Sequence, residues 1–337
     1  MARTLVMGLT ESGTRTTINE DTFSLGDRVY PDMITGAEER SGGSSAYTQL
    51  YIVTQGLGGS GVGDLAGRIV QRASLDLLEQ LASYKQPKLN FRAFANDLIR
   101  EAHERIGRQI ALRNEFNAGA SFALFLIDAN NAYVLNVGHT NIRLFRDNEL
   151  FALSGTSGSK DPQDRVLIGD RTATSPPLPN TIKHFELCPG DIILLSTQGF
   201  NCGYHDSRLT EDLASPDAFA AIIRQMQIRS RESDNTENGT VLAIKVRDLE
   251  LVEPSEHSPR SEELRRIYHD GINERDAPAQ IVETRTDDAR RETEEETMES
   301  YGTKGKRKSN GKVFFLSLLL GFLIGIVIIL LIWFIIL

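Results

Sequence analysis

The last 25 residues form an unbroken apolar run, and no other feature constrains the chain so strongly. From Val313 to Leu337 every residue is apolar or small except Ser317 and Trp333. A helix of this length rises about 37 Å, which exceeds the roughly 30 Å hydrocarbon core of a bilayer. A buried helix of a soluble protein would carry a polar stripe, and the run has none. We therefore expect residues 313–337 to form one transmembrane helix.

The residues just before this run are positively charged. Residues 301–312 contain no acidic side chain and five basic ones, namely Lys304, Lys306, Arg307, Lys308 and Lys312. By the positive-inside rule this flank stays in the cytoplasm, and residues 1–13 lack the pattern of a signal peptide. We expect a single-pass C-terminal anchor with a cytoplasmic N-terminal domain, the plasma membrane being the preferred location. Gly321 and Gly325 have the spacing of a helix-dimer face, so a homodimer is a weaker expectation.

Residues 249–312 have the composition of a flexible linker. Between residues 249 and 300 the chain holds 16 acidic and 7 basic side chains and almost no aromatic ones. Such a segment cannot bury enough apolar surface to offset the entropy lost on folding. We expect a linker that is first acidic and then basic. Its acidic part sums to −9 and its basic part to +5, while residues 1–248 sum to −5, so the net charge of −9 is an average over segments of different character.

Residues 1–248 have the pattern of one domain of mixed strands and helices. Apolar residues recur at helical spacing in 64–82 and 91–112, and a third helix is expected at 217–226. Apolar runs predict strands at residues 47–54, 121–127, 132–137, 142–146, 149–153, 182–186, 191–196 and 239–246. The short connections at 128–131 and 147–148 favour antiparallel hairpins. The pattern predicts an α+β fold with helices packed on sheets.

A glycine-rich turn lies between the first predicted strand and the first predicted helix. Residues Gly56 to Gly63 contain the G-x-G-x-x-G spacing of dinucleotide-binding proteins. That fold requires a parallel strand after the helix, whereas here a second helix and antiparallel hairpins follow. A dinucleotide site is therefore not expected.

Six motifs occur in the order that one enzyme family uses. They are Gly13 with Asn19-Glu20-Asp21, Gly56-Leu57-Gly58-Gly59, Asn136-Val137-Gly138, Pro189-Gly190-Asp191, Ser196-Thr197-Gln198-Gly199 and Glu237-Asn238-Gly239-Thr240-Val241. In order and spacing, residues 1–248 resemble the PPM (type 2C) metal-dependent serine/threonine phosphatases. The resemblance implies an αββα sandwich of two antiparallel sheets flanked by helices. It also implies a site at one end where carboxylates hold two Mg²⁺ or Mn²⁺ ions that activate water against phosphoserine or phosphothreonine.

Compared with the family pattern, the metal-site positions have lost much of their negative charge. Gln55 and Gln198 occupy positions where the family has aspartates, and Glu237 replaces an aspartate with a longer side chain. Only Glu20 and Asp21 keep their expected carboxylates. We expect Gln55 and Gln198 to bond to each other or to water. We expect no cofactor, unless Glu20, Asp21 and Glu237 still bind Mg²⁺ or Mn²⁺.

Other positions of the implied site also depart from the family. Gly56 retains the backbone carbonyl that the family uses, but the phosphate-binding arginine falls at Thr16, with Arg15 one residue out of phase. His139 stands where active members have an aspartate. It is interpreted as a surface or hydrogen-bonded histidine, with a metal ligand as the less favoured alternative. No catalytic residue set is therefore intact.

These substitutions favour a membrane-anchored pseudophosphatase without two-metal catalysis, acting as a regulatory or binding module in serine/threonine phosphorylation signalling. The expected partner is a protein, either a serine/threonine kinase or a phosphoprotein, and no nucleic acid is expected. Two alternatives stay open. One is a phosphatase of low activity with a reduced metal site, and the other is a membrane adaptor that uses a surface away from the cleft.

Overall fold

The computed structural model describes residues 1–249, apart from residues 16, 35, 60, 86, 112–117, 155–166, 171–174 and 203. The predicted linker beyond Leu249, the predicted span Val313–Leu337 and the predicted phosphate-site position Thr16 therefore lie outside the described residues. Within the described part, no helix is long and apolar enough to cross a membrane.

The described residues form two six-stranded sheets in which neighbouring strands are antiparallel. The first sheet has the order β4 (Ala37–Ser44), β1 (Ala2–Glu11), β12 (Gly239–Leu249), β11 (Ile192–Ser196), β8 (Asn141–Arg146) and β9 (Glu149–Ala152). The second has the order β10 (Thr181–Glu186), β7 (Asn131–Val137), β6 (Gly119–Asp128), β5 (Thr48–Leu57), β2 (Asp21–Leu25) and β3 (Arg28–Tyr30).

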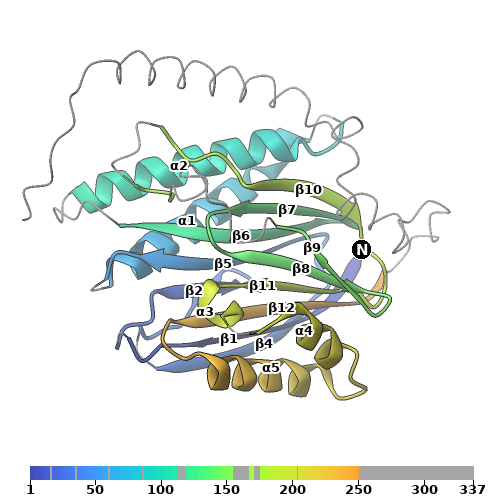
Figure 1. Ribbon diagram of the computed structural model, residues 1–337. Helices are drawn as coiled ribbons and strands as arrows, with labels where there is room; N and C mark the ends of the chain where they lie inside the picture. Colours follow the sequence, from blue (N-terminus) through green and yellow to red (C-terminus); the bar gives the residue numbers. More distant parts are fainter. Residues whose placement is uncertain are drawn as a thin grey trace, which may run out of the picture. The chain divides into compact units, whose positions relative to one another are not determined.

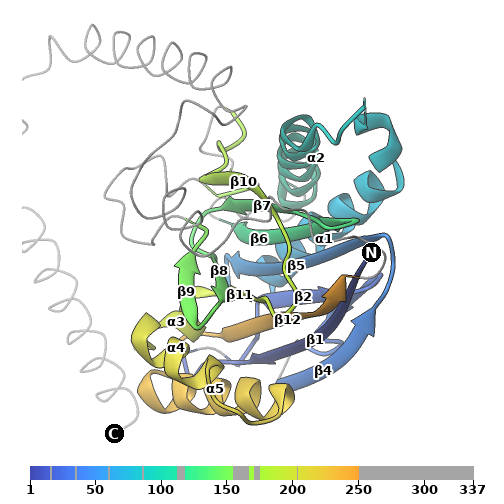
Figure 2. The ribbon, with the colours of Figure 1, turned by 90° about the vertical axis from the view of Figure 1, so that its right-hand side faces the viewer.

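Helices cover the outer faces of the two sheets (Figures 1 and 2). On the second sheet lie α1 (Val62–Glu79) and α2 (Phe91–Ala111), joined through the short 3₁₀ helix η1 (Leu81–Tyr84). On the first sheet lie α4 (Asp206–Leu213) and α5 (Phe219–Ser233), preceded by the single turn α3 (Gln198–Asn201). The arrangement is the expected α+β sandwich of helix, sheet, sheet and helix.

Three apolar layers hold these elements together, and β6 shows how the sequence supplies two of them. Alternate side chains of a strand point to opposite faces of its sheet. Phe122 and Leu124 pack under α1 and α2, whereas Ala123 and Phe125 pack between the sheets. Because both of its faces are buried, β6 has an almost continuous apolar sequence. The third layer, including Met226, lies between the first sheet and helices α4 and α5.

The predicted helices and the eight predicted strands are all present, with shifted ends. Strand β5 continues to Leu57 because Gly56 and Leu57 still pair with β6. Helix α5 runs seven residues beyond its predicted end at residue 226. The sequence reasoning missed β1 to β4. The edge strand β4 illustrates the cause: its sequence AEERSGGS has low strand propensity, and it is extended because it pairs with β1.

Candidate functional site

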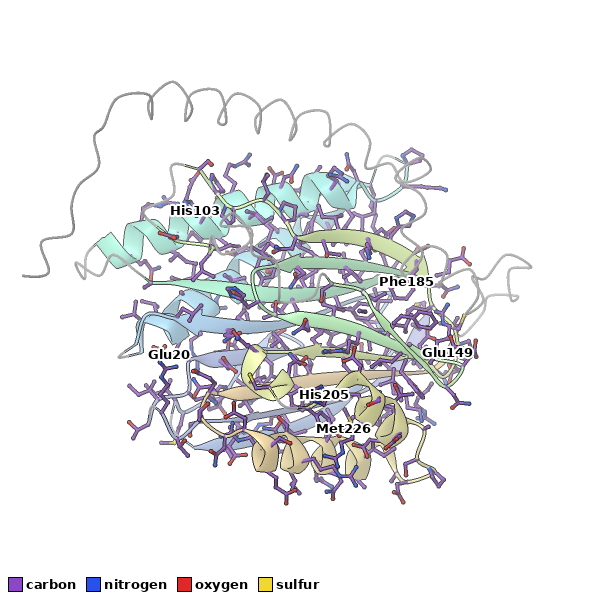
Figure 3. The ribbon with its side chains drawn as sticks, in the orientation of Figure 1. Glu20, His103, Glu149, Phe185, His205 and Met226 are labelled. Carbon is purple, nitrogen blue, oxygen red and sulfur yellow. The ribbon has the colours of Figure 1, made fainter. Side chains whose placement is uncertain are left out.

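At one end of the sandwich the core between the sheets gives way to buried polar side chains. Asp21 on β2 pairs in register with Gln55 on β5, which in turn pairs with Ser121 on β6. Opposite them lie two buried threonines, Thr197 just after β11 and Thr240 in β12. Figure 3 shows Glu20 at this end, whereas Phe185 and Glu149 lie toward the opposite end. The fold therefore gathers the predicted site residues at one place.

Glu20 binds the glycine-rich turn with its carboxylate. The backbone N–H groups of Gly61 and Gly63 donate to Oε1 at 3.0 and 3.2 Å, and that of Gly59 donates to Oε2 at 3.2 Å. Positive φ angles at Gly58, Gly59 and Gly61 let these N–H groups converge, a backbone conformation that glycine adopts without strain. The turn opens α1, whose N-terminus also favours a negative charge. The carboxylate thus acts as an internal acceptor for the turn.

Asp21 is buried and surrounded by hydroxyl groups. Thr197 Oγ1 donates to Asp21 Oδ2 at 2.7 Å and accepts the backbone N–H of Thr240 at 3.0 Å. Burial raises the pKa of Asp21 to about 7. Hydrogen bonds from Thr197 and Thr240 oppose this rise in pKa, and the negative charges of Glu20 and Glu237 add to it. A carboxyl with this pKa is partly protonated at neutral pH.

Gln55 and Gln198, which were predicted to stand at metal-site positions, occupy different environments. Gln55 is buried, and its Oε1 accepts the backbone N–H of Gln198 at 3.2 Å. The Gln198 residue itself is exposed at the start of α3. The expected contact between the two residues is present, but it joins a side chain to a backbone group. It ties β5 of one sheet to the end of β11 in the other.

Glu237 is paired with a cation from the chain itself. Its Oε1 accepts a hydrogen bond from Arg15 Nη1, and the backbone N–H of Arg15 donates to the Thr236 carbonyl at 3.0 Å. Asn238 Oδ1 accepts the Gly13 N–H at 3.0 Å, so the loop after β1 is fastened to the loop before β12. Arg15, which the family register places one residue out of phase, therefore lies at the site.

The donor set does not fit the two metal ions that the fold family implies. Hard divalent cations need several anionic oxygens with free lone pairs. Here the Glu20 carboxylate accepts three N–H groups, Asp21 is hydrogen-bonded to a hydroxyl, and Glu237 faces a guanidinium. Among the described residues, no three His, Cys, Asp or Glu side chains form a group able to hold a metal, and His139 therefore belongs to none.

Sequence reasoning missed the hydroxyl groups that complete the site. Thr10 Oγ1 lies 2.6 Å from Thr240 Oγ1 and accepts from Asn19 Nδ2 at 2.8 Å, while Thr197 bonds to Asp21. The available signal was strand alternation. Thr240 lies on the same face of β12 as Leu242 and Ile244, which pack in the core between the sheets. Alternation along the strand therefore places its hydroxyl at the end of that core.

No protein-family model matches the sequence, and a comparison with curated proteins finds no match. Solved structures of bacterial phosphatases match the fold. The Mycobacterium tuberculosis serine/threonine phosphatase PstP/Ppp shares 19% identity at a TM-score of 0.56, covering 73% of this chain and 100% of that one. The S. agalactiae serine/threonine phosphatase shares 17% sequence identity at a TM-score of 0.56, and the match covers 72% of this chain and 99% of that one. A third match is PppA, described as a key regulatory component of T6SS in Pseudomonas aeruginosa. It shares 19% sequence identity at a TM-score of 0.53, and the match covers 72% of this chain and 96% of that one. The described domain thus has the fold of the PPM-type serine/threonine phosphatases.

Proposed function

We propose that this chain is a membrane-anchored pseudophosphatase, a PPM-type domain that binds a protein partner in serine/threonine phosphorylation signalling without two-metal catalysis. The proposal rests on one observation, which concerns the hydrogen-bond and ion-pair partners of the acidic side chains at the site. Glu20, Asp21 and Glu237 each have a partner supplied by the chain, and the neutral Gln55 completes the set. The same fold in PppA, which is described as a regulatory component, supports a regulatory role.

The proposed partner is a kinase or a protein segment that carries phosphoserine or phosphothreonine, bound at the end of the sandwich that holds Gln198. This residue is exposed, and its neighbour Gly199 lies close to Glu237. The side chain of Arg15, which pairs with Glu237, is 71% exposed. Val313–Leu337 is proposed to hold the domain at the cytoplasmic face of a membrane, preferably the plasma membrane. The rival functions are weak phosphatase activity and an adaptor that uses another surface.

The first experiment measures turnover. The purified full chain is incubated with phosphoserine and phosphothreonine peptides and MnCl₂, and phosphate release is compared with that of Glu20→Ala. We expect no release above the buffer control. Metal-dependent release that disappears in Glu20→Ala would establish the low-activity phosphatase instead.

The second experiment measures binding at the proposed end. An array of phosphorylated peptides and their unphosphorylated counterparts is probed with the full chain, with Gln198→Arg and with Glu104→Arg. The last is a matched control at an exposed position of α2. We expect phosphate-dependent binding that changes only in Gln198→Arg. Binding that both variants leave unchanged would favour the adaptor.

A further inference from the structure

We propose that the chain supplies its own counter-charges at this end of the sandwich, the glycine-rich turn for Glu20 and Arg15 for Glu237, so that the folded state needs no divalent metal. The inference concerns the same site as the proposed function, but it states how the site is stabilised rather than what it binds. It follows from the mismatch between the donor set and the metals that the fold family implies.

The first part of the argument is the fit of Glu20 to the turn. Three backbone N–H groups lie 3.0 to 3.2 Å from its two oxygens. The contact is close, since a Cβ added to Gly63 would lie 2.8 Å from Glu20 Oε2. To bind a metal, the carboxylate would have to release N–H groups that have no other acceptor among the described contacts, and unsatisfied donors near the core are costly.

The second part is the backbone that places Arg15 beside Glu237. The N–H groups of Thr14 and Arg15 donate to the carbonyls of Asn235 and Thr236 at 2.8 and 3.0 Å. These two backbone bonds align the loop that contains Arg15 with the loop that contains Glu237, and this alignment places the two side chains next to each other. The Arg15 guanidinium beside this carboxylate offsets part of the negative charge that would attract a divalent cation.

The experiment measures thermal unfolding of the purified full chain in EDTA, in millimolar MgCl₂ and in millimolar MnCl₂. A metal that binds only the folded state raises the Tm as its concentration exceeds the Kd. We expect the wild-type Tm to change by less than about 1 °C between these conditions. A saturable rise in the wild-type Tm with Mn²⁺ or Mg²⁺ would overturn the proposal.

Glu20→Gln tests the contact with the turn. It keeps the length of the side chain but replaces one acceptor oxygen by an NH₂ group that faces N–H donors. We expect the Tm to fall by roughly 4–10 °C. The matched control is Glu104→Gln on α2, which we expect to leave the Tm within about 1 °C. A Glu20→Gln protein with the wild-type Tm contradicts the assigned role of Glu20.

Arg15→Ala tests the built-in cation. Removing the guanidinium leaves the Glu237 carboxylate unpaired, so we expect calorimetric titration to detect tighter Mn²⁺ binding than in the wild type. In the double variant Arg15→Ala/Glu237→Gln the gain should disappear. If Arg15→Ala gains no affinity for Mn²⁺, Arg15 does not replace a metal at this site.

The outcomes separate this inference from the proposed function. Metal-independent stability without phosphopeptide binding would support the inference and contradict the function. Phosphopeptide binding together with a saturable Mn²⁺ effect on the wild-type Tm would do the reverse.

Discussion

At Asp21 burial and charge conflict. Its side chain is 1% exposed, and its partners are hydroxyls rather than a cation. In the unfolded chain the carboxyl loses its proton near pH 3.8, whereas burial raises the native pKa to about 7. Between these values the native state holds a proton that the unfolded state has released. The contribution of Asp21 to stability is therefore full below pH 3.8 and is lost as the pH rises to about 7.

Asp21→Asn should remove this pH dependence, because the amide stays neutral and keeps an oxygen for Thr197. The difference in pKa from 3.8 to about 7 corresponds to about 4 kcal/mol. We expect urea unfolding to show that the wild type loses stability relative to Asp21→Asn between pH 4.5 and pH 8, by an amount on this order. Parallel curves for the two proteins would contradict the burial argument.

Gly199 shows how closely the chain approaches itself near the site. A Cβ at this position would lie 2.0 Å from the carbonyl oxygen of Asn238, a backbone atom that cannot turn away. At Gly107, within α2, no described residue beyond the adjoining backbone of that helix has an atom within 4 Å of an added Cβ. The two glycines form a matched pair for the same substitution.

Gly199→Ala should destabilise the domain by about 2 kcal/mol or more, because the loop before β12 must move. Gly107→Ala should stabilise it by about 0.5–1 kcal/mol, because alanine favours the helix. Chemical denaturation of both variants checks the prediction. Similar effects of the two substitutions would show that the loop is free to move.

At the scale of elements, a buried ion pair accounts for the Pro189-Gly190-Asp191 motif. Arg146 at the end of β8 donates from Nε and Nη2 to the Asp191 carboxylate at 2.7 and 2.6 Å. The same carboxylate accepts the Cys188 N–H at 2.8 Å, so the turn entering β11 is held against β8. The side chains are 3% and 0% exposed. The motif is therefore structural in this chain.

Asp191→Asn should cost about 3–5 kcal/mol, because it leaves the Arg146 guanidinium buried without its counter-charge. The control is Glu39→Gln, which breaks the exposed pair between β4 and Arg224 of α5 and should cost less than about 1 kcal/mol. Equilibrium unfolding in urea compares them. Equal losses of unfolding free energy would mean that burial does not decide how much these ion pairs stabilise the domain.

Elements also differ in how far the sequence predicts them. The helices α1 and α2 were predicted because their apolar residues recur at helical spacing along many turns. Strands β1 and β4 were missed. β1 lacks clear alternation because residues on both faces of the strand are buried. The sequence of β4, AEERSGGS, is mostly polar or glycine. β1 pairs with β4 and with β12, which is more than 220 residues away, and local propensity carries no information about such partners.

At the scale of the whole molecule, the proposed membrane attachment depends only on Val313–Leu337. Alkaline carbonate extraction should leave the full chain in the membrane pellet. Ile326→Arg/Ile329→Arg should release it, since each arginine near the centre of a span costs about 2.5–3.5 kcal/mol. Ile329→Leu is the apolar control and should stay in the pellet. A double-arginine variant retained in the pellet would show that the apolar run is not the anchor.

The sequence by itself determined the apolar C-terminal run, the main helices, the hairpins and the order of the motifs, because these depend on residues close together in the chain. It also predicted that Gln55 and Gln198 stand where the resembling family has aspartates. Only the tertiary structure decided what the remaining acids do. Glu20 contacts the turn at Gly59–Gly63, Asp21 meets Thr197, and Glu237 meets Arg15, which is more than 200 residues away. The packing of two sheets creates these contacts, and no local pattern specifies which distant donor will reach a given carboxylate.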